Sequence, residues 1–179
     1  VKVFDNYATY GGGIYIESSD PELTNVIVNN NSNRGIWMIT SNAKMYGCII
    51  TDNENICTSC VGGGILLTYS NPIMRGGEIS YNRSGNKGGG MYMNSSNPFM
   101  SDMLIHHNTA GISVYANHGG GGISLFNSSP TILNTDIYDN DGCPGNSHYC
   151  SGGGIRYNGG EGDPILKNVL IRNNKAYNS

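Results

Sequence analysis

Apolar and polar residues alternate over short stretches of this chain, and the same stretch recurs six times. An alternation with a period of two is typical of a β-strand, because successive side chains point to opposite faces. In the first repeat Ile14 and Ile16 face one way, whereas Tyr15 and Glu17 face the other. Each repeat opens with glycine and an apolar residue, at Gly13-Ile14, Gly35-Ile36, Gly64-Ile65, Gly90-Met91, Gly122-Ile123 and Gly154-Ile155. The pattern predicts one short strand at the start of each repeat.

Fixed spacings follow each opening pair. Seven residues beyond the apolar residue stands an anchor position, at Pro21, Ala43, Pro72, Pro98 and Pro130; the sixth repeat is two residues longer and reaches Pro164. An asparagine stands ten residues after every anchor, at Asn31, Asn53, Asn82, Asn108, Asn140 and Asn174. The chain also starts with a partial repeat, which ends at Asn6. Between these asparagines and the next opening pair, the connector varies from 3 to 13 residues.

A part of fixed length that alternates with a variable connector is typical of a solenoid. Apolar residues also form columns, such as the one seven residues past the anchor, which holds isoleucine or valine throughout. Columns of like residues indicate parallel, in-register stacking at about 4.8 Å per coil. Four residues past the anchor stand only Asn, Asp or Gly, which tolerate a left-handed bend. The sequence therefore predicts a three-sided parallel β-helix of about six coils plus a partial one, with a ladder of stacked asparagines inside one turn.

Composition narrows the class of protein. The 27 glycines and 25 asparagines make up 52 of 179 residues and disfavour helices. The net charge of −3, with 10 scattered lysines and arginines, does not favour nucleic acid as a partner. No stretch approaches the roughly 20 apolar residues of a membrane helix, so no membrane span is expected. We expect residues 1–179 to form a single solenoid domain.

The repeats resemble a known group of proteins. The segment from Asn140 to Gly154-Ile155 and the segment Ile105-His106-His107-Asn108 are similar to the Gly-Gly-x-Ile and Phe-x-x-Asn repeats of chlamydial polymorphic membrane proteins. Isoleucine or valine replaces the phenylalanine here. The resemblance extends to right-handed parallel β-helix proteins of bacterial surfaces. It implies a right-handed, all-β fold, an extracellular or cell-surface location and a role in adhesion, and it supplies no catalytic residue.

Four of the five cysteines lie in variable connectors: Cys57, Cys60, Cys143 and Cys150. A zinc site with four thiolates is disfavoured, because the two connectors belong to coils about 14 Å apart. We instead expect each pair to close its own connector as a disulfide, which implies an oxidising compartment. The fifth cysteine, Cys48, falls in an apolar column and is predicted to be a buried free thiol.

The outward side of the first strands is the predicted binding surface. It carries aromatic and apolar residues: Tyr15, Trp37, Ile39, Leu66, Tyr92 and Phe126. A contiguous apolar patch marks a partner site, and flat rings suit sugar rings or another protein. The alternative is that a connector folds over these side chains and buries them. Glu17 and Arg156 are the charged residues of this face, about 24 Å apart, so it offers no acid/base pair.

The best group of titratable residues lies on the second strands. Glu78 and Asp136 share a column six residues past the anchor, with His106 on the coil between them. They are the candidate catalytic residues of a polysaccharide lyase or glycoside hydrolase, because such enzymes need an acid and a base beside one sugar linkage. The alternative is a solvated strand face. Asp139-Asn140-Asp141-Gly142 offers oxygens to Ca²⁺ but lacks the length of a dedicated calcium loop, so no resident cofactor or metal is expected.

Neither end of the sequence carries a helix or a polar strand that would cap a solenoid. Uncapped ends favour pairing with further strands, so we expect a segment of a longer solenoid or a fibre subunit that stacks end to end. The leading hypothesis is a non-enzymatic surface module that binds a glycan or a cell-surface protein through its lateral face. The alternatives are a carbohydrate-active enzyme and a self-assembling filament.

Overall fold

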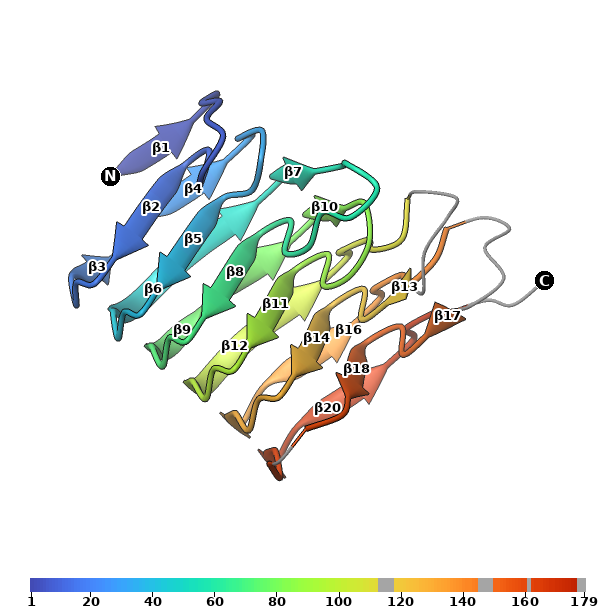
Figure 1. Ribbon diagram of the computed structural model, residues 1–179. Helices are drawn as coiled ribbons and strands as arrows, with labels where there is room; N and C mark the ends of the chain where they lie inside the picture. The colour runs from blue at the N-terminus through green and yellow to red at the C-terminus, as the bar shows by residue number, and fades with distance from the viewer. Residues whose placement is uncertain (113–117, 145–149, 161, 177–179) are drawn as a thin grey trace.

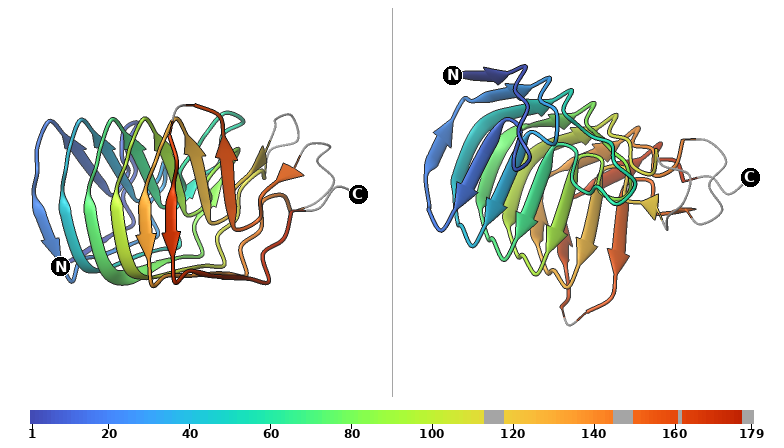
Figure 2. Two further views of the ribbon diagram at one scale, coloured as in Figure 1. Left: turned by 90° about the horizontal axis from the view of Figure 1, so that it is seen from below. Right: turned by 45° about the horizontal axis from the view of Figure 1, so that its top comes forward.

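The computed structural model describes residues 1–112, 118–144, 150–160 and 162–176, which wind into a parallel β-helix (Figure 1). One strand from each repeat stacks in parallel to form the first sheet. Its strands are β2 (Ile14–Glu17), β5 (Ile36–Ile39), β8 (Ile65–Thr68), β11 (Met91–Asn94), β14 (Ile123–Phe126) and β18 (Ile155–Asn158). The register pairs Ile14 with Ile36 and Ile36 with Ile65, as the repeat predicts. Figure 2 shows the coils stacked along one axis.

The second sheet lies behind the first sheet and carries the second half of each fixed segment (Figure 2). Three coils contribute one long strand, three others contribute two short strands, and the partial coil at the start contributes one short strand. Its strands are β1 (Lys2–Phe4), β3 (Glu22–Thr24), β4 (Ile27–Asn29), β6 (Lys44–Thr51), β9 (Ile73–Ser80), β12 (Phe99–His106), β15 (Thr131–Leu133), β16 (Asp136–Tyr138), β19 (Ile165–Lys167) and β20 (Leu170–Arg172). All of their pairings are parallel and in register.

A left-handed residue bends every coil of the second sheet at the same place. The bend residues are Asn25, Gly47, Gly76, Asp102, Asn134 and Asn168, and their φ angles lie between 46° and 59°. Side chains with a branched or bulky Cβ disfavour this conformation, whereas Gly, Asn and Asp tolerate it. The prediction of a bend column four residues past the anchor is confirmed.

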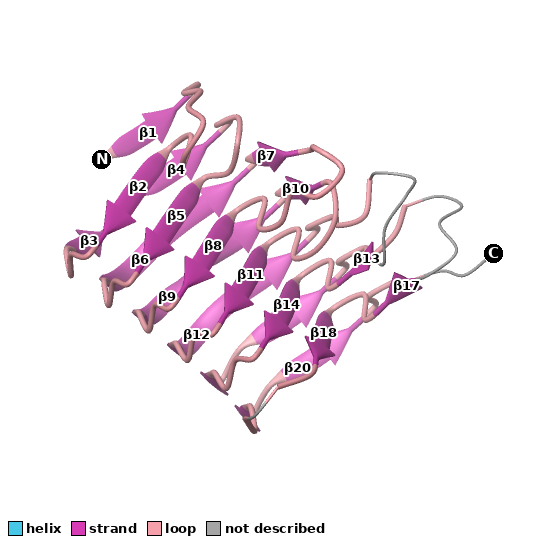
Figure 3. Ribbon diagram, viewed as in Figure 1, coloured by secondary structure: helices cyan, strands magenta, loops and turns pink. Residues whose placement is uncertain are grey.

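The third side of the coil is the least regular. It carries the short strands β7 (Glu54–Asn55), β10 (Arg83–Ser84), β13 (His118–Gly119) and β17 (Cys150–Ser151). Single parallel bridges continue this side, for example from Ser32 to Glu54 and from Arg83 to Thr109. Figure 3 shows that the connectors run from this side back to the first sheet as loops. The variable connectors therefore add their length outside the packed part of the coil.

The interior is a set of apolar columns. The inward residues of the first sheet face those of the second sheet and are almost fully buried; they include Ile36, Met38, Ile65, Leu67, Met91 and Met93, with Met45, Ile50, Met74, Ile79, Met100 and Ile105 opposite them. Methionine suits such a column because its flexible side chain fills gaps between stacked neighbours.

Stacked asparagines form a ladder inside the turn after the second sheet. The side-chain oxygen of Asn53 accepts hydrogen bonds from the backbone nitrogen and the side-chain amide of Asn31, at 3.0 and 2.9 Å. The same pair of bonds joins each asparagine of the column to the next, from Asn6 through to Asn174. Buried backbone groups must be paired. The asparagine side chains provide these hydrogen bonds to the backbone of the turn, which lies outside the strands. The predicted ladder is confirmed.

A second ladder, which we did not predict, lies in the turn between the two sheets. Serine hydroxyls two residues before four of the six anchors accept hydrogen bonds from the backbone nitrogen of the serine one coil earlier. The acceptors are Ser41, Ser70, Ser96 and Ser128, all fully buried. The turns before and after the second sheet thus each contain a column of stacked polar side chains.

The cysteines follow the prediction as far as the structure describes them. Cys57 and Cys60 form a disulfide with Cα atoms 4.9 Å apart, and Cys48 is a buried free thiol. Cys143 is also disulfide-bonded. The side chain of Cys150, its predicted partner, lies outside the described residues, so that pairing stays a prediction.

Candidate functional site

Three aromatic rings gather on the outward side of the first sheet at its N-terminal end. Trp37 on β5 lies beside Tyr15 on β2, with ring centroids 5.5 Å apart and the rings edge to face. Tyr10, from the connector before β2, lies 5.4 Å from Trp37 and 6.4 Å from Tyr15. Tyr10 is 62% exposed and Tyr15 is 41% exposed, while Trp37 is half-buried between them. We call Tyr10, Tyr15 and Trp37 the aromatic cluster.

The structure separates the other residues of the predicted binding surface. Ile39 is half-buried next to the aromatic cluster, and Phe126 is exposed four strands away. Tyr92 is half-buried near Arg156; burial raises the pKa of its hydroxyl, and Arg156 acts in the opposite direction. Leu66 is only 7% exposed, so it contributes no accessible surface. The exposed aromatic surface is therefore smaller than the predicted face.

The middle of this face is buried. Leu66 is 7% exposed, and Ser124, at the same column on β14, is fully buried, with a hydroxyl that has no partner among the described residues. The connector passes equally close to Leu66 and to Tyr15, because an added Cβ would lie 3.1 Å from the Leu66 Cβ at Gly62 and 3.1 Å from the Tyr15 Cβ at Gly11. Burial therefore holds for Leu66 but not for Tyr15.

A buried arginine lies against the aromatic cluster. The guanidinium carbon of Arg34 is 4.6 Å from the centre of the Trp37 ring, a cation–π contact. The Nε atom of Arg34 and the Nε1 atom of Trp37 are both buried and have no hydrogen-bond partner among the residues that the structure describes. Burial lowers the pKa of Arg34 to about 10, so the side chain stays charged at neutral pH. The sequence analysis missed Tyr10 and Arg34, because both come from connectors of variable length.

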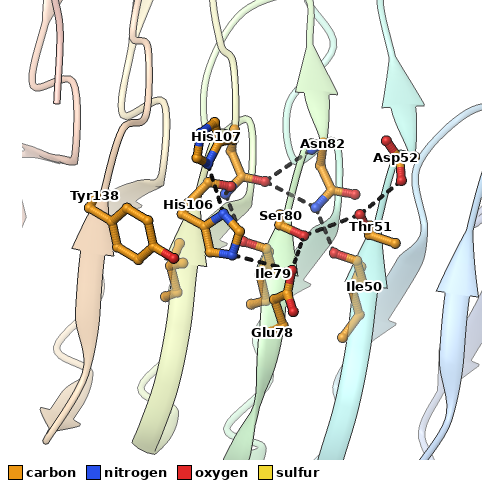
Figure 4. A network of polar contacts seen from close by, with 12 residues as sticks. Ile50, Thr51, Asp52, Glu78, Ile79, Ser80, Asn82, His106, His107 and Tyr138 are labelled. Atoms are coloured by element: carbon orange, nitrogen blue, oxygen red, sulfur yellow. Dashed lines mark hydrogen bonds and ion pairs between the residues drawn. The ribbon is translucent and has the colours of Figure 1, made fainter. Parts of the chain in front are cut away.

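A second group of polar residues lies on the second sheet (Figure 4). The Nε2 atom of His106 on β12 is 3.2 Å from the Oε1 atom of Glu78 on β9. Glu78 also accepts a hydrogen bond of 2.6 Å from the hydroxyl of Ser80, whose oxygen lies 3.1 Å from the hydroxyl oxygen of Thr51. On the other side of the ring, His106 Nδ1 is 2.9 Å from Nδ1 of His107. Glu78 and His106 are therefore in contact, as their shared face predicts.

The contacts assign the protons of the two histidines. An ionised carboxylate can only accept, so Nε2 of His106 carries the proton that faces Glu78. In a neutral imidazole the other nitrogen is then an acceptor, so Nδ1 of His107 is the donor between the two rings. The other ring nitrogen of His107, Nε2, belongs to an exposed side chain. The sequence analysis missed His107, whose left-handed φ of 54° turns it away from the strand alternation.

Aromatic packing holds His106 in place. Its ring stacks on Tyr138 with centroids 4.7 Å apart and an angle of 14°, and Arg172 lies 4.5 Å from the Tyr138 ring. His106 is 8% exposed. Burial lowers its pKa below the ordinary value, while the Glu78 carboxylate raises it and the neighbouring His107 lowers it. The balance keeps His106 neutral near pH 7, which agrees with the proton assignment.

Asp136 does not join this group. In the register of the second sheet Leu104 lies between Glu78 and Asp136, so the two carboxylates are two strand spacings apart, or roughly 10 Å. No ion pair or hydrogen bond links Asp136 to His106 in the described part of the chain. The polar group consists of Glu78, His106 and His107 rather than the predicted set with Asp136.

Shallow hollows flank the two histidines along the turn of the asparagine ladder. One, of about 290 Å³, is lined by His107, Asp139, Asp141 and Lys175, among others. Another, of about 350 Å³, includes Asp52, Glu54, Tyr81 and Arg83. The ring of Tyr81 stacks on His107 at 4.9 Å. His107 therefore lies at a polar edge of the solenoid, where it lines one of the two hollows.

The described residues show no group of three or more His, Cys, Asp or Glu side chains that could hold a metal ion. In the turn predicted as a weak Ca²⁺ ligand set, the Asp141 carboxylate accepts a hydrogen bond of 2.9 Å from the Cys143 nitrogen. This bond is typical of an aspartate turn. Across the same described ranges, no helix has the length and apolarity needed to cross a bilayer.

The stacked coils, the parallel register and the ladders agree with a comparison against known families. The family described as the right-handed β-helix region matches residues 53–179. The chain belongs to this right-handed β-helix family. The curated proteins and the solved structures contain no match to it. Membership of the family establishes the fold and its hand, whereas the function must come from the sites described above.

Proposed function

We propose that this right-handed β-helix is an extracellular, non-enzymatic, adhesin-like module that binds a glycan through the aromatic cluster. The single observation that carries the proposal is the exposure of Tyr10 and Tyr15 around Trp37 on a rigid sheet. Aromatic rings present a large apolar body with a polar tip, which suits the mixed apolar and hydroxyl surface of a sugar ring.

The scaffold supports a binding role. Tyr15 and Trp37 stand on neighbouring strands in register, so their spacing is fixed by backbone hydrogen bonds rather than by a loop. A site on paired strands loses little conformational freedom when a ligand binds. Tyr10 comes from the connector and closes one side of Trp37. The arrangement gives a preformed edge of three rings with Ile39 beside it.

The location is inferred from two features. The Cys57–Cys60 disulfide is typical of proteins that fold in an oxidising compartment. The resemblance of the repeats to chlamydial polymorphic membrane proteins supports a role at a cell surface. Together they favour the extracellular assignment over a cytosolic one.

The proposal is tested on a glycan array with the wild-type protein and the double variant Trp37→Ala, Tyr15→Ala. We expect the wild type to be retained on at least one glycan and the variant to lose more than about 90% of that signal, since aromatic anchors carry most of the energy of such contacts. Phe126→Ala is the matched control, because this ring is exposed on the same sheet but lies far from the aromatic cluster. Equal retention of wild type and double variant would refute the proposal.

A second candidate function is a carbohydrate-active enzyme, and the observation that favours it is the hydrogen-bonded row Glu78, His106 and His107. An exposed imidazole that is oriented by a second group has the geometry of a general base. Incubation with acidic and neutral polysaccharides, with a readout of reducing ends and of unsaturated uronates, tests it. Turnover that is lost in His107→Asn and Glu78→Gln but kept in Asp136→Asn would establish the enzyme and displace the first proposal.

A further inference from the structure

Arg34 is an anomaly in the repeat. The equivalent position, two residues before the first strand residue, is glycine in the other five coils: Gly12, Gly63, Gly89, Gly121 and Gly153. Those glycines do not have a left-handed φ, whereas Arg34 has a φ of 74°. A left-handed non-glycine residue costs of order 1–3 kcal/mol and persists where the surroundings impose it. The only tryptophan of the chain, Trp37, stands in the same coil.

The charge of Arg34 has no partner in the described part of the protein. Arg34 is 8% exposed, and it forms no ion pair or hydrogen bond from its side chain within the described residues. A buried charge without a partner is strongly unfavourable, so such groups are normally paired. The contact with the Trp37 ring compensates only part of this cost.

Two buried donors without a partner therefore lie next to each other. Nε of Arg34 and Nε1 of Trp37 are both buried N–H groups without an acceptor among the described residues. The terminal nitrogens of Arg34 have no partner in this part of the chain either, but they are not among the buried unpartnered atoms, so they keep contact with solvent. Unsatisfied buried donors indicate an acceptor that the protein itself does not supply. A guanidinium group selects oxyanions, which it binds through paired N–H donors.

We infer that Arg34 and Trp37 form a subsite for an anionic group of the bound glycan, a carboxylate or a sulfate, at the buried edge of the aromatic cluster. The inference rests on the proposed glycan-binding function and names the class of glycan. The sugar ring lies against Tyr10 and Tyr15, and its oxyanion accepts hydrogen bonds from Arg34. The net charge of −3 and the Glu17 carboxylate beside Tyr15 both disfavour a general attraction of acidic polymers, so the selection of an anion in this subsite depends on Arg34.

The first experiment needs no glycan. The protein has one tryptophan, so its indole N–H gives one resolved signal in a ¹H–¹⁵N spectrum. Acetate and sulfate are titrated against chloride at constant ionic strength. We expect a saturable shift of this signal with acetate and sulfate but not with chloride. A signal that does not respond to either oxyanion, for example because a buried water already fills the position, would overturn the inference.

Three variants separate anion binding from packing. Arg34→Gly restores the residue of the other five coils, and Arg34→Met keeps an unbranched chain over the Trp37 ring without the charge. Both should fold and lose the shift. Arg75→Met is the matched control, because Arg75 makes a similar contact with Phe99, at 5.1 Å, on another part of the solenoid. An unchanged response in Arg34→Gly and Arg34→Met would show that Arg34 has only a structural role.

The second experiment compares an oligogalacturonate with its methyl ester, which has the same sugar backbone without the charge. Wild type should bind the acid at least about 10-fold more tightly than the ester, because one charge-assisted hydrogen bond contributes a difference of this size. Arg34→Gly should abolish the difference in affinity. Equal binding of acid and ester through Tyr15 and Trp37 would refute the anionic subsite and leave the glycan-binding proposal standing. An anion response without binding of any glycan would refute the glycan-binding proposal and retain the anion site.

Discussion

The side-chain oxygen of Asn82 accepts two hydrogen bonds from Asn53, one from the backbone nitrogen at 3.0 Å and one from the side-chain amide at 2.9 Å. Both residues are fully buried. The amide of Asn82 in turn donates to the carbonyl of Ile50 and to the side-chain oxygen of Asn108. One carboxamide thus joins three consecutive coils, and its removal leaves partners unpaired in each of them.

We predict that Asn82→Ala lowers the free energy of unfolding by about 3 kcal/mol or more, because each unsatisfied buried partner costs about 1–3 kcal/mol. Urea unfolding followed by circular dichroism measures the change. Asn97→Ala is the control, since Asn97 also links neighbouring coils but lies on the exposed side of the turn. Equal losses in the two variants would contradict the role assigned to the buried ladder.

A second prediction concerns the bend column. Gly76 has a φ of 57° and open space around its Cα, so the cost of a side chain there comes from the backbone alone. Gly76→Ala should destabilise the fold by about 1 kcal/mol, whereas Gly76→Asn should be close to neutral. Asn25 and Asn134 already occupy the same position in other coils. If alanine and asparagine give the same thermal midpoint, the left-handed bend does not determine the residue choice.

At Gly64 the lack of space for a side chain, rather than the backbone conformation, requires glycine. An added Cβ would lie 2.6 Å from the carbonyl oxygen of Gly90 in the next coil, closer than non-bonded atoms allow. Because this neighbour is backbone in a paired sheet, it cannot move aside. Gly64→Ala should cost more than Gly76→Ala, by at least about 1 kcal/mol, since overpacking of a rigid site is strongly unfavourable. Chemical denaturation of both variants under one set of conditions measures the difference.

The stability of the protein should depend on pH through His106. Its pKa is lower in the folded state than the unfolded value of 6.5, mainly because of burial. The unfolded chain therefore binds the proton more readily, and this contribution to stability is present above about pH 6.5 and is lost as the pH falls through the folded value. The slope at one such group is at most about 1.4 kcal/mol per pH unit. His106→Gln should remove this part of the slope in denaturation curves between about pH 5 and 7.5.

The titration of His106 also tests the role of Glu78. Glu78→Gln removes the carboxylate that raises the pKa of His106, so the midpoint of the His106 titration should fall further. The Cε1–H signal of His106 in a proton NMR titration reports this midpoint. Asp136→Asn serves as the control, because Asp136 is a carboxylate of the same sheet that is not among the charges that shift the pKa of His106. A midpoint that rises in Glu78→Gln would contradict the assigned contact.

Thiol counting tests the cysteine assignments. Unfolding without reductant should expose one reactive thiol per chain, that of Cys48, and reduction should expose all five. Three thiols before reduction would show that the connector with Cys143 and Cys150 is open in solution. Cys57→Ser with Cys60→Ser should lower the free energy of unfolding by no more than about 2 kcal/mol, because the loop that the disulfide closes is very short.

The repeat predicted the scaffold because its structural residues stand at fixed offsets. Asn31 and Asn53 occupy the same place in their coils, and so do the bend residues Asn25 and Gly47. In-register stacking turns such an offset directly into a contact between neighbouring coils. The serine ladder has an equally regular spacing, at Ser41 and Ser70, and could have been found by the same reasoning.

The sites were harder to predict because they depend on residues outside the alternation. Tyr10 and Arg34 belong to connectors of different length, so no column places them beside Trp37. His107 occupies a left-handed position, where the rule for opposite faces of a strand does not apply. Leu66 follows the alternation outward, yet it is only 7% exposed. The alternation predicts which way a strand side chain points, but it does not predict which other residues contact or bury that side chain.

The asparagine ladder has a consequence for how the protein can change length. Every coil presents the same donor pair to the coil after it and the same acceptor to the coil before it. A duplicated coil could be inserted between any two of these coils, and its asparagine would hydrogen-bond to the asparagines of both neighbouring coils. Insertion or deletion of whole coils, of 22 to 34 residues each, would therefore keep every asparagine of the ladder hydrogen-bonded to its neighbours. A deletion within the fixed 17-residue segment would break these hydrogen bonds.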